Sequence, residues 1–205
     1  MQAFGGSWTR TKLAVLKKYL EAYMSLMTRN PRAKHFHKLY VDAFAGSGEV
    51  YLRSARLAEG RDSGPDDELP WPIEGSTKIA LDLPIPFDEY LFVEKRRRNV
   101  RLLEALRQNH ALRDRIRIKH GDANKFLQEW IQTVDWNKCR ALVFLEPFAL
   151  QVDFATIAAL GRTQAVDLWL LFPISAVNRM LVTRGKPAER WKDRLDRFFG
   201  TRDWE

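Results

Sequence analysis

The sequence contains one cysteine and no long apolar run. Cys139 has no second thiol in the chain to pair with, so no internal disulfide can form. The longest wholly apolar stretch, residues 168–174, is far too short to cross a bilayer, and no membrane span is expected. Residues 1–20 carry four Lys or Arg residues and lack the apolar stretch of a secretory signal. We therefore expect a protein of the reducing cytoplasm.

What remains is an ordinary globular composition, with 45% hydrophobic and 29% charged residues in a chain of 205. This length fits one α/β domain, or one domain and a fragment. The net charge of +8 is concentrated in residues 1–38, which hold eight basic residues and one acid. Such a positive field suits a polyanion. The alternative is a solvated basic helix that only keeps the protein soluble.

Residues 1–38 form the first predicted unit, a basic helical segment packed on the core. Ser7 or Thr9 can cap a helix that stops at Asn30-Pro31. One stripe of this helix is apolar and consists of Leu13, Leu16, Leu20, Met24 and Met27. The helix is expected to dock through this stripe.

Residues 39–205 form the second predicted unit, in which apolar strands alternate with helices. Strands are expected at residues 39–44, 89–93, 115–119, 141–145 and 166–172. Helices are expected at residues 49–57, 98–110, 124–134, 154–160 and 188–199. This alternation is typical of a parallel sheet covered on both faces, so the predicted fold is α/β, a doubly wound Rossmann-like sheet. Such a sheet usually carries one or two further strands at its last edge, which favours a chain truncated at the C-terminal edge.

Residues 60–89 differ in character from the rest of this unit. They hold eight acids against two basic residues, and five of the nine prolines. Proline cannot donate to a strand ladder and restricts the residue before it. We therefore expect an acidic, proline-rich surface insertion with little regular structure except around residues 78–81.

Acidic residues stand at the ends of four successive predicted strands. Asp42 precedes a glycine turn, and Glu94, Asp122 and Glu146 follow the next three strands. Ligands of doubly wound sheets bind at the carboxyl ends of the strands, near the point where the strand order reverses. Each acid alone could be a helix cap or a surface charge, and the turn alone could be a tight connection. Together they predict a site for a nucleoside-bearing cofactor, with Glu94 on a ribose diol and Asp122 near an adenine.

Residues 42–48, Asp-Ala-Phe-Ala-Gly-Ser-Gly, resemble the first motif of class I S-adenosylmethionine-dependent methyltransferases that act on nucleic-acid bases. More specifically, the chain resembles the three-Cys-motif partner protein family over residues 8–23, 40–48, 87–95, 144–153 and 167–173. The resemblance implies a methyltransferase-like domain, S-adenosylmethionine as the cofactor, and a three-cysteine-motif protein encoded nearby as a functional partner. The implied cofactor-binding residues are Trp8, Lys12, Asp42, Phe44, Ala45, Gly46, Gly48, Glu94, Lys95, Asp122 and Ala123.

The motif Glu146-Pro147-Phe148-Ala149 stands where that family usually has Asp-Pro-Phe/Tyr-Gly. In the related amino-directed DNA methyltransferases, the polar residue accepts a hydrogen bond from an exocyclic amine, and the aromatic ring stacks on a base drawn out of the helix. Glu146, Pro147 and Phe148 are therefore the predicted catalytic residues. The extra methylene of Glu146 moves its carboxylate by on the order of an ångström, and a displacement of that size can cost about a hundredfold in rate. A weakened or repurposed site is therefore left open.

Six basic residues are predicted to contact nucleic acid: Arg10, Lys17, Lys18, Arg96, Arg97 and Arg98. Those at 96–98 open a helix, where positive charge opposes the helix dipole, and this placement indicates a phosphate partner. Surface arginines that snorkel explain it almost as well.

Two other groups of residues are assigned structural roles. Cys139 lacks the Pro-Cys context in which carbon-5 cytosine methyltransferases present a nucleophile, so it is interpreted as a small buried hydrophobe. His35 and His37 have no acid or cysteine at ligand spacing, so no metal site is predicted.

Three functions are consistent with these residues. The preferred one is S-adenosylmethionine-dependent methyl transfer to nucleic acid, on an exocyclic amine of a base. The second is a binding module, the nucleic-acid-contacting half of a two-protein system without methyl transfer. The third, a nicotinamide-dependent oxidoreductase, is disfavoured because the turn lacks the third glycine of the dinucleotide fingerprint.

Overall fold

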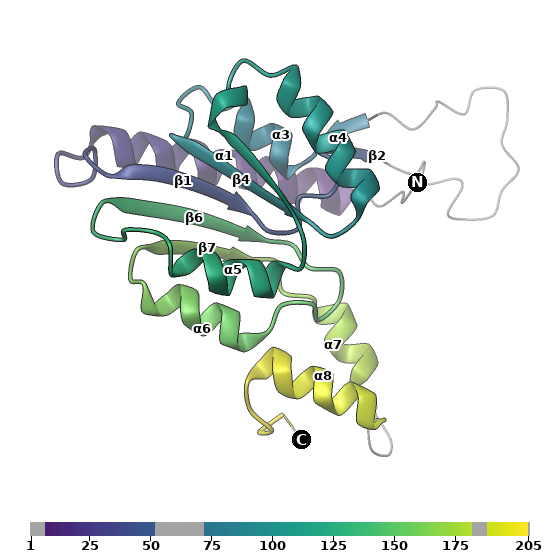
Figure 1. The fold of residues 1–205 in the computed structure, drawn as a ribbon. Coiled ribbons are helices and arrows are strands. Elements are labelled where there is room, and N and C mark those ends of the chain that lie inside the picture. The colour runs from purple at the N-terminus through teal and green to yellow at the C-terminus, as the bar shows by residue number, and fades with distance from the viewer. Residues whose placement is uncertain (1–6, 52–71, 182–187, 205) are drawn as a thin grey trace, which may run out of the picture.

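The computed structural model describes residues 7–51, 72–181 and 188–204, and its centre is a five-stranded parallel sheet (Figure 1). The five strands are β1 (His37–Asp42), β4 (Glu89–Glu94), β5 (Ile116–His120), β6 (Cys139–Leu145) and β7 (Val166–Leu170). They are arranged in the order β5-β4-β1-β6-β7, and every neighbouring pair is parallel. This confirms the predicted α/β, Rossmann-like sheet, because the chain winds outward from β1 in one direction and then in the other.

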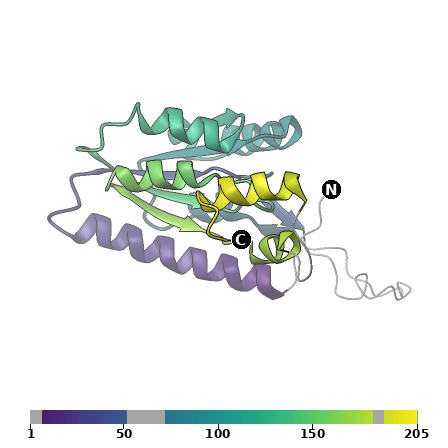
Figure 2. The ribbon, with the colours of Figure 1, turned by 90° about the horizontal axis from the view of Figure 1, so that it is seen from below.

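Helices cover both faces of the sheet, as the apolar strands predict (Figures 1 and 2). One face is covered by α1 (Ser7–Arg29), α3 (Ser76–Leu81) and α4 (Arg97–Gln108). The other is covered by α5 (Ala123–Ile131) and α6 (Phe154–Arg162). Successive strand residues alternate between the two cores: Tyr40 packs on the first face, and Leu39 and Val41 pack on the second.

The helix α1 docks through its apolar stripe, as the sequence predicts. Its five stripe residues, Leu13, Leu16, Leu20, Met24 and Met27, are all buried. At its outer side, Tyr19 donates a hydrogen bond to Asp167 of β7 at 2.8 Å and packs edge-on against Trp169. The helix thus lies along the sheet and leaves Arg10, Lys17, Lys18 and Arg29 exposed.

Two predictions for the segment after β1 are wrong. Residues 49–51 form β2 (Glu49–Tyr51) instead of opening a helix, and they pair antiparallel with β3 (Pro72–Glu74), where little regular structure was expected. The remaining residues of that predicted helix, 52–57, lie outside the described residues. A two-stranded ribbon satisfies the backbone of both short segments through pairing across the chain, which a local pattern does not reveal.

The second half of the predicted surface insertion belongs to the core. Ile79, Leu83 and Phe87 are buried, and they pack with α1 and the strands on one face of the sheet. Asp82 and Pro84 are exposed between these apolar residues, so overall composition concealed the packed face. Residues 60–71 lie outside the described residues.

The last two helices form a smaller cluster at the carboxyl edge of the sheet. They are α7 (Ile174–Met180), which the sequence analysis did not predict, and α8 (Glu189–Phe199). Leu195 and Phe198 of α8 pack with Val177 of α7 and Leu150. Figure 2 shows α8 beside α6. In the described part of the chain, no helix combines the length and apolar character that crossing a membrane requires.

Candidate functional site

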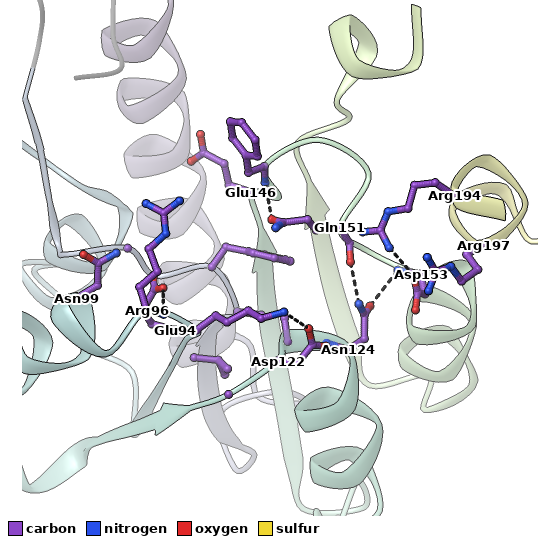
Figure 3. A pocket seen from close by; sticks show the side chains of 18 residues that line it. Glu94, Arg96, Asn99, Asp122, Asn124, Glu146, Gln151, Asp153, Arg194 and Arg197 are labelled. Atoms are coloured by element: carbon purple, nitrogen blue, oxygen red, sulfur yellow. Dashed lines mark hydrogen bonds and ion pairs between the residues drawn. The ribbon is translucent and has the colours of Figure 1, made fainter. Parts of the chain in front are cut away.

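A cavity of about 540 Å³ opens at the carboxyl ends of the central strands (Figure 3). Its walls come from the segments that follow β1, β4, β5 and β6, and from α8. Its lining residues are Ala43, Phe44, Gly46, Val93, Glu94, Lys95, Arg96, Asn99, Gly121, Asp122, Ala123, Asn124, Glu146, Phe148, Gln151, Asp153, Arg194 and Arg197. This place beside the strand-order reversal is where doubly wound sheets bind ligands, and the volume suits a small-molecule cofactor.

The glycine turn divides into residues that face the cavity and residues that support the fold. Phe44 and Gly46 line the cavity, and a Cβ built on Gly46 would meet no atom within 4 Å. Gly48 instead lies against α4, where a Cβ would stand 3.3 Å from Leu106 Cδ1. Ala45 is buried, and its N–H donates to Val93 at 3.2 Å. Of the turn residues predicted to bind the cofactor, Ala45 and Gly48 therefore do not line the cavity.

The carboxylates of Glu94 and Asp122 both line the cavity, as their strand-end positions predict. Glu94 Oε1 accepts a hydrogen bond from the Arg96 N–H at 2.6 Å. Asp122 caps α5, where its Oδ1 accepts from the N–H groups of Asn124 at 3.1 Å and Lys125 at 3.4 Å. The Lys95 ammonium lies 3.3 Å from Asp122 Oδ2.

Charge and hydrogen bonding keep Asp122 ionised. Partial burial raises the pKa of this carboxyl, but the N–H of Lys125 and the Lys95 ammonium outweigh it, so the pKa lies below its ordinary value. Glu94 and Asp122 thus present hydrogen-bond acceptors to one hollow from two adjacent strands.

Asp42 is not among the residues that line the cavity, which corrects its predicted role as a direct cofactor ligand. It is completely buried at the end of β1. Ser76 of α3 donates to its Oδ2 at 2.6 Å, and the Phe44 N–H donates to its Oδ1 at 3.1 Å. Burial raises its pKa to about 7, against the opposing effect of these two hydrogen bonds. Asp42 therefore supports the turn from beneath and joins it to α3.

Of the predicted catalytic motif, Glu146 and Phe148 line the cavity, whereas Pro147 is buried behind it. The Lys12 ammonium lies 2.5 Å from Glu146 Oε1, and the Lys12 side chain is only 9% exposed. Lys12 was predicted to complete the cofactor pocket, but it lies outside the lining and reaches the carboxylate of Glu146 instead. The amino-terminal helix thus positions Glu146.

The loop after Glu146 holds Phe148 in place through a set of hydrogen bonds (Figure 3). The Phe148 N–H donates to Gln151 Oε1 at 3.0 Å, and Asn124 Nδ2 donates to the Gln151 carbonyl at 2.7 Å. Asn124 Oδ1 also accepts from the Asp153 N–H at 2.9 Å. The Phe148 side chain is 61% exposed on this fixed loop.

Ala149 adopts φ +59°, a left-handed conformation that favours glycine. The turn therefore has a glycine-type backbone although its residue is alanine.

The predicted nucleic-acid contacts are split between two places. Arg96 lines the cavity, and Arg97 and Arg98 are exposed at the start of α4 without lining it. Arg10, Lys17 and Lys18 are exposed along α1 and also lie outside the lining. Trp8 belongs to α1, but its side chain is outside the described part of the structure. The two implied cofactor residues Lys95 and Ala123 both line the cavity.

Cys139 and His37 both lie outside the cavity lining. Cys139 begins β6, is half-buried at the edge of the core, and has its thiol pKa raised by burial. His37 begins β1, at the opposite edge of the sheet from the cavity, with Asp88 and Glu89 within 4 Å.

Sequence reasoning missed several lining residues, above all Asn99, Asn124, Gln151, Asp153, Arg194 and Arg197. Asn124 directly follows the predicted Asp122-Ala123 pair, so its place at a helix start was a usable signal. Gln151 and Asp153 stand in a stretch that carries the family resemblance. The two arginines of α8 had no local signal, because only the packing of that helix brings them to the cavity.

No family model matches the sequence, and no curated protein matches it. Among solved structures, protein LPL1258 from Legionella pneumophila str. Philadelphia 1, described by the family model DUF519, matches with a TM-score of 0.56 and 14% identity, over 91% of this chain and 73% of that chain. A conserved hypothetical protein of Streptococcus pyogenes matches with a TM-score of 0.39 and 18% identity over 66% of this chain, which spans 65% of that protein's length. The Legionella likeness supports the Rossmann-like fold. Neither description names the three-Cys-motif partner family, so that resemblance stays a prediction.

Proposed function

We propose that this protein is an S-adenosylmethionine-dependent methyltransferase that acts on nucleic acid, on an exocyclic amine of a base. One observation carries the proposal: Glu94 and Asp122 face the same cavity as Glu146 and Phe148. Adenosine-binding acids and an amine-binding motif thus share one hollow. Each pair alone has a structural explanation, but their convergence favours a reaction between a nucleoside cofactor and a base.

The residues present fit such a cofactor. The Glu94 carboxylate can accept both hydrogen bonds of a ribose diol, and Asp122, which follows the neighbouring strand, could meet the adenine. Gly46 leaves open space above the turn, where an amino-acid tail could approach the backbone. The acids also suit a ligand with a positive sulfonium. When bound, S-adenosylmethionine supplies an activated methyl group.

The protein's own part in the reaction is to position the amine and to take its proton. The Glu146 carboxylate can accept a hydrogen bond from the target amine. As the amine nitrogen bonds to the methyl carbon, the carbon–sulfur bond of the donor would break to leave a neutral thioether, and the amine proton would pass to this carboxylate. Lys12 fixes Oε1 of this carboxylate and balances its charge. Positioning of this kind supplies most of the rate in a transfer that needs no covalent protein intermediate.

Phe148 offers a surface on which the target base can stack. Its ring is exposed, and its backbone is held by Gln151. An exposed aromatic ring on a hydrogen-bonded backbone, beside a hydrogen-bond acceptor, suits the stacking and hydrogen bonding by which enzymes read a flipped base. Phe148→Ala should therefore lower methyl transfer and leave the affinity for S-adenosylmethionine unchanged.

Calorimetric titration with S-adenosylmethionine tests the cofactor assignment. Glu94→Ala should raise the dissociation constant at least about tenfold, because hydrogen bonds to a charged group are each worth about 1.5–3 kcal/mol. Glu104→Ala is the matched control, since Glu104 pairs with Arg107 on α4 and does not line the cavity. Equal affinity in the two variants would remove the cofactor assignment.

Incubation with labelled methyl donor and separate DNA and RNA pools tests the reaction. Labelled nucleic acid that disappears in Glu146→Gln supports methyl transfer to an amine. Salt-dependent nucleic-acid binding without any label would instead identify a binding module.

A further inference from the structure

Arginine side chains reach the cavity from two opposite sides. Arg96 lines the wall at the start of α4, and Arg194 and Arg197 of α8 line the wall across from it (Figure 3). We propose that these three arginines form a clamp, the arginine clamp, which grips the phosphate backbone of the nucleic-acid substrate on both sides of the base that enters the cavity. This inference rests on the proposed function.

Two acidic residues of α8 are paired, whereas two of its arginines line the cavity. Glu189 pairs with Lys192 at 2.9 Å. Asp196 accepts hydrogen bonds from Arg202 at 3.0 Å and from Trp204 at 2.9 Å. These acids are therefore engaged along the helix and its C-terminal turn. Arg194 and Arg197, three residues apart and on one face, are the charged residues of α8 that line the cavity.

The two arginines of α8 differ in how tightly the protein holds them. Arg194 is half-buried and lies 3.8 Å from Asp153 Oδ1, which orients its guanidinium toward the cavity. Arg197 is exposed, and its Nε donates to the Asp193 carbonyl at 3.4 Å, the long limit of hydrogen-bond geometry. The exposed guanidinium of Arg197, held by one long hydrogen bond, suits bidentate binding of phosphate.

The number and spread of the arginines favour a polyanion over a single carboxylate. The cofactor carries one carboxylate, which can engage one wall of the cavity. Arg96 and the pair on α8 stand on different walls, so an anion that meets all three must extend across the cavity mouth. The exposed Phe148 belongs to the same lining. Arginines at the rim of a cavity, beside an aromatic stacking surface, resemble the elements that bind single-stranded nucleic acid.

The arginine clamp differs from the basic surface that the sequence suggested first. Arg10, Lys17 and Lys18 are exposed on α1, but none of them lines the cavity. They can add charge at a distance, whereas the clamp residues stand where the base must enter. The two surfaces therefore make different predictions for substitution.

Fluorescence anisotropy with labelled single-stranded oligonucleotides, one DNA and one RNA of matched sequence, tests the clamp. Titrations between about 50 and about 200 mM salt should show that Arg197→Glu and Arg96→Glu each weaken binding about tenfold or more. The slope of log affinity against log salt should fall by about one for each arginine–phosphate pair that a substitution removes. The preferred oligonucleotide identifies the substrate as DNA or RNA.

Controls separate the clamp from folding and from cofactor binding. Arg162→Glu makes the same charge change at an exposed position at the end of α6 that does not line the cavity, and it should bind like the unsubstituted protein apart from a small general effect. Arg197→Gln is a milder variant that should show the same direction if charge reversal disturbs α8. Circular dichroism and melting curves check that each variant folds.

Three results would overturn the clamp. One is equal oligonucleotide affinity in Arg197→Glu and Arg162→Glu. Another is a loss confined to Lys17→Glu, which would place the nucleic acid on α1. A third is a loss of S-adenosylmethionine affinity in Arg197→Glu with oligonucleotide binding retained. If instead the unsubstituted protein bound no S-adenosylmethionine but oligonucleotide affinity still fell in Arg197→Glu, the proposed function would fail and the clamp would stand.

Discussion

Replacing Asp42 with asparagine should remove a pH-dependent loss of stability. The carboxyl is completely buried beneath the glycine turn, and burial raises its pKa from 3.8 to about 7. In the unfolded chain the same group titrates near its ordinary value. Between these two pH values the folded protein therefore binds a proton that the unfolded chain has lost, so the free energy of unfolding falls as the pH rises.

The size of the effect follows from the difference between the two pKa values. Each pH unit in this window costs about 1.4 kcal/mol, and the full loss above pH 7 is about 4 kcal/mol. Asparagine is neutral at every pH and nearly the same shape. Its amide oxygen can accept from the Phe44 N–H, and its NH₂ can donate to the Ser76 hydroxyl, so both hydrogen bonds of Asp42 have counterparts.

Urea unfolding of both proteins between about pH 5 and about pH 8 measures this effect. As the pH rises through this range, the free energy of unfolding of Asp42→Asn should increase relative to that of the parent. The gain should be on the order of a few kcal/mol. Titrating groups that do not interact with Asp42 contribute equally to both proteins and cancel in the difference. Asp114→Asn, at an exposed position, should show no such gain. A difference between Asp42→Asn and the parent that stays constant with pH would refute the reasoning.

Three further changes test the loops of the site by urea or thermal unfolding. Ala149→Gly should stabilise the protein by about 0.5–1 kcal/mol, because the relief of left-handed strain at φ +59° exceeds the added chain entropy of glycine. An unchanged or lower melting temperature would contradict this. Gly48→Ala should destabilise the protein by about 1–3 kcal/mol, since φ is +82° and the new methyl would crowd Leu106. An unchanged stability would show that α4 shifts to accommodate the methyl group. Asn124→Ala should lower the free energy of unfolding by about 2 kcal/mol, because it removes hydrogen bonds to Gln151 and Asp153. A decrease under about 0.5 kcal/mol would show that the loop after Glu146 does not depend on Asn124.

The strands and the main helices could be predicted because their signals are local. The apolar run at residues 141–145 appears as the carboxyl half of β6, and the stripe from Leu13 to Met27 is the buried face of α1. Alternation of such strands with helices also fixed the parallel sheet. Since parallel strands end at one edge, the convergence of Glu94 and Asp122 followed from their positions alone.

Other features could not be predicted, because they depend on partners far away in the chain. Residues 49–51 become a strand only through pairing with residues 72–74. Asp42 looked like a ligand by position, but Ser76, 34 residues later, covers it. The Lys12 side chain meets Glu146 across 134 residues. No window of neighbouring residues contains both members of such a pair.

The sequence by itself determined the five parallel strands and the edge at which the acids gather, because hydrophobic period and strand direction are properties of short segments. Only the tertiary structure decided which polar groups face the cavity. It buried Asp42, tied Glu146 to α1, and turned Arg194 and Arg197 of α8 toward the same hollow. The physical reason is that burial, ion pairing and the direction of a side chain depend on which elements pack together.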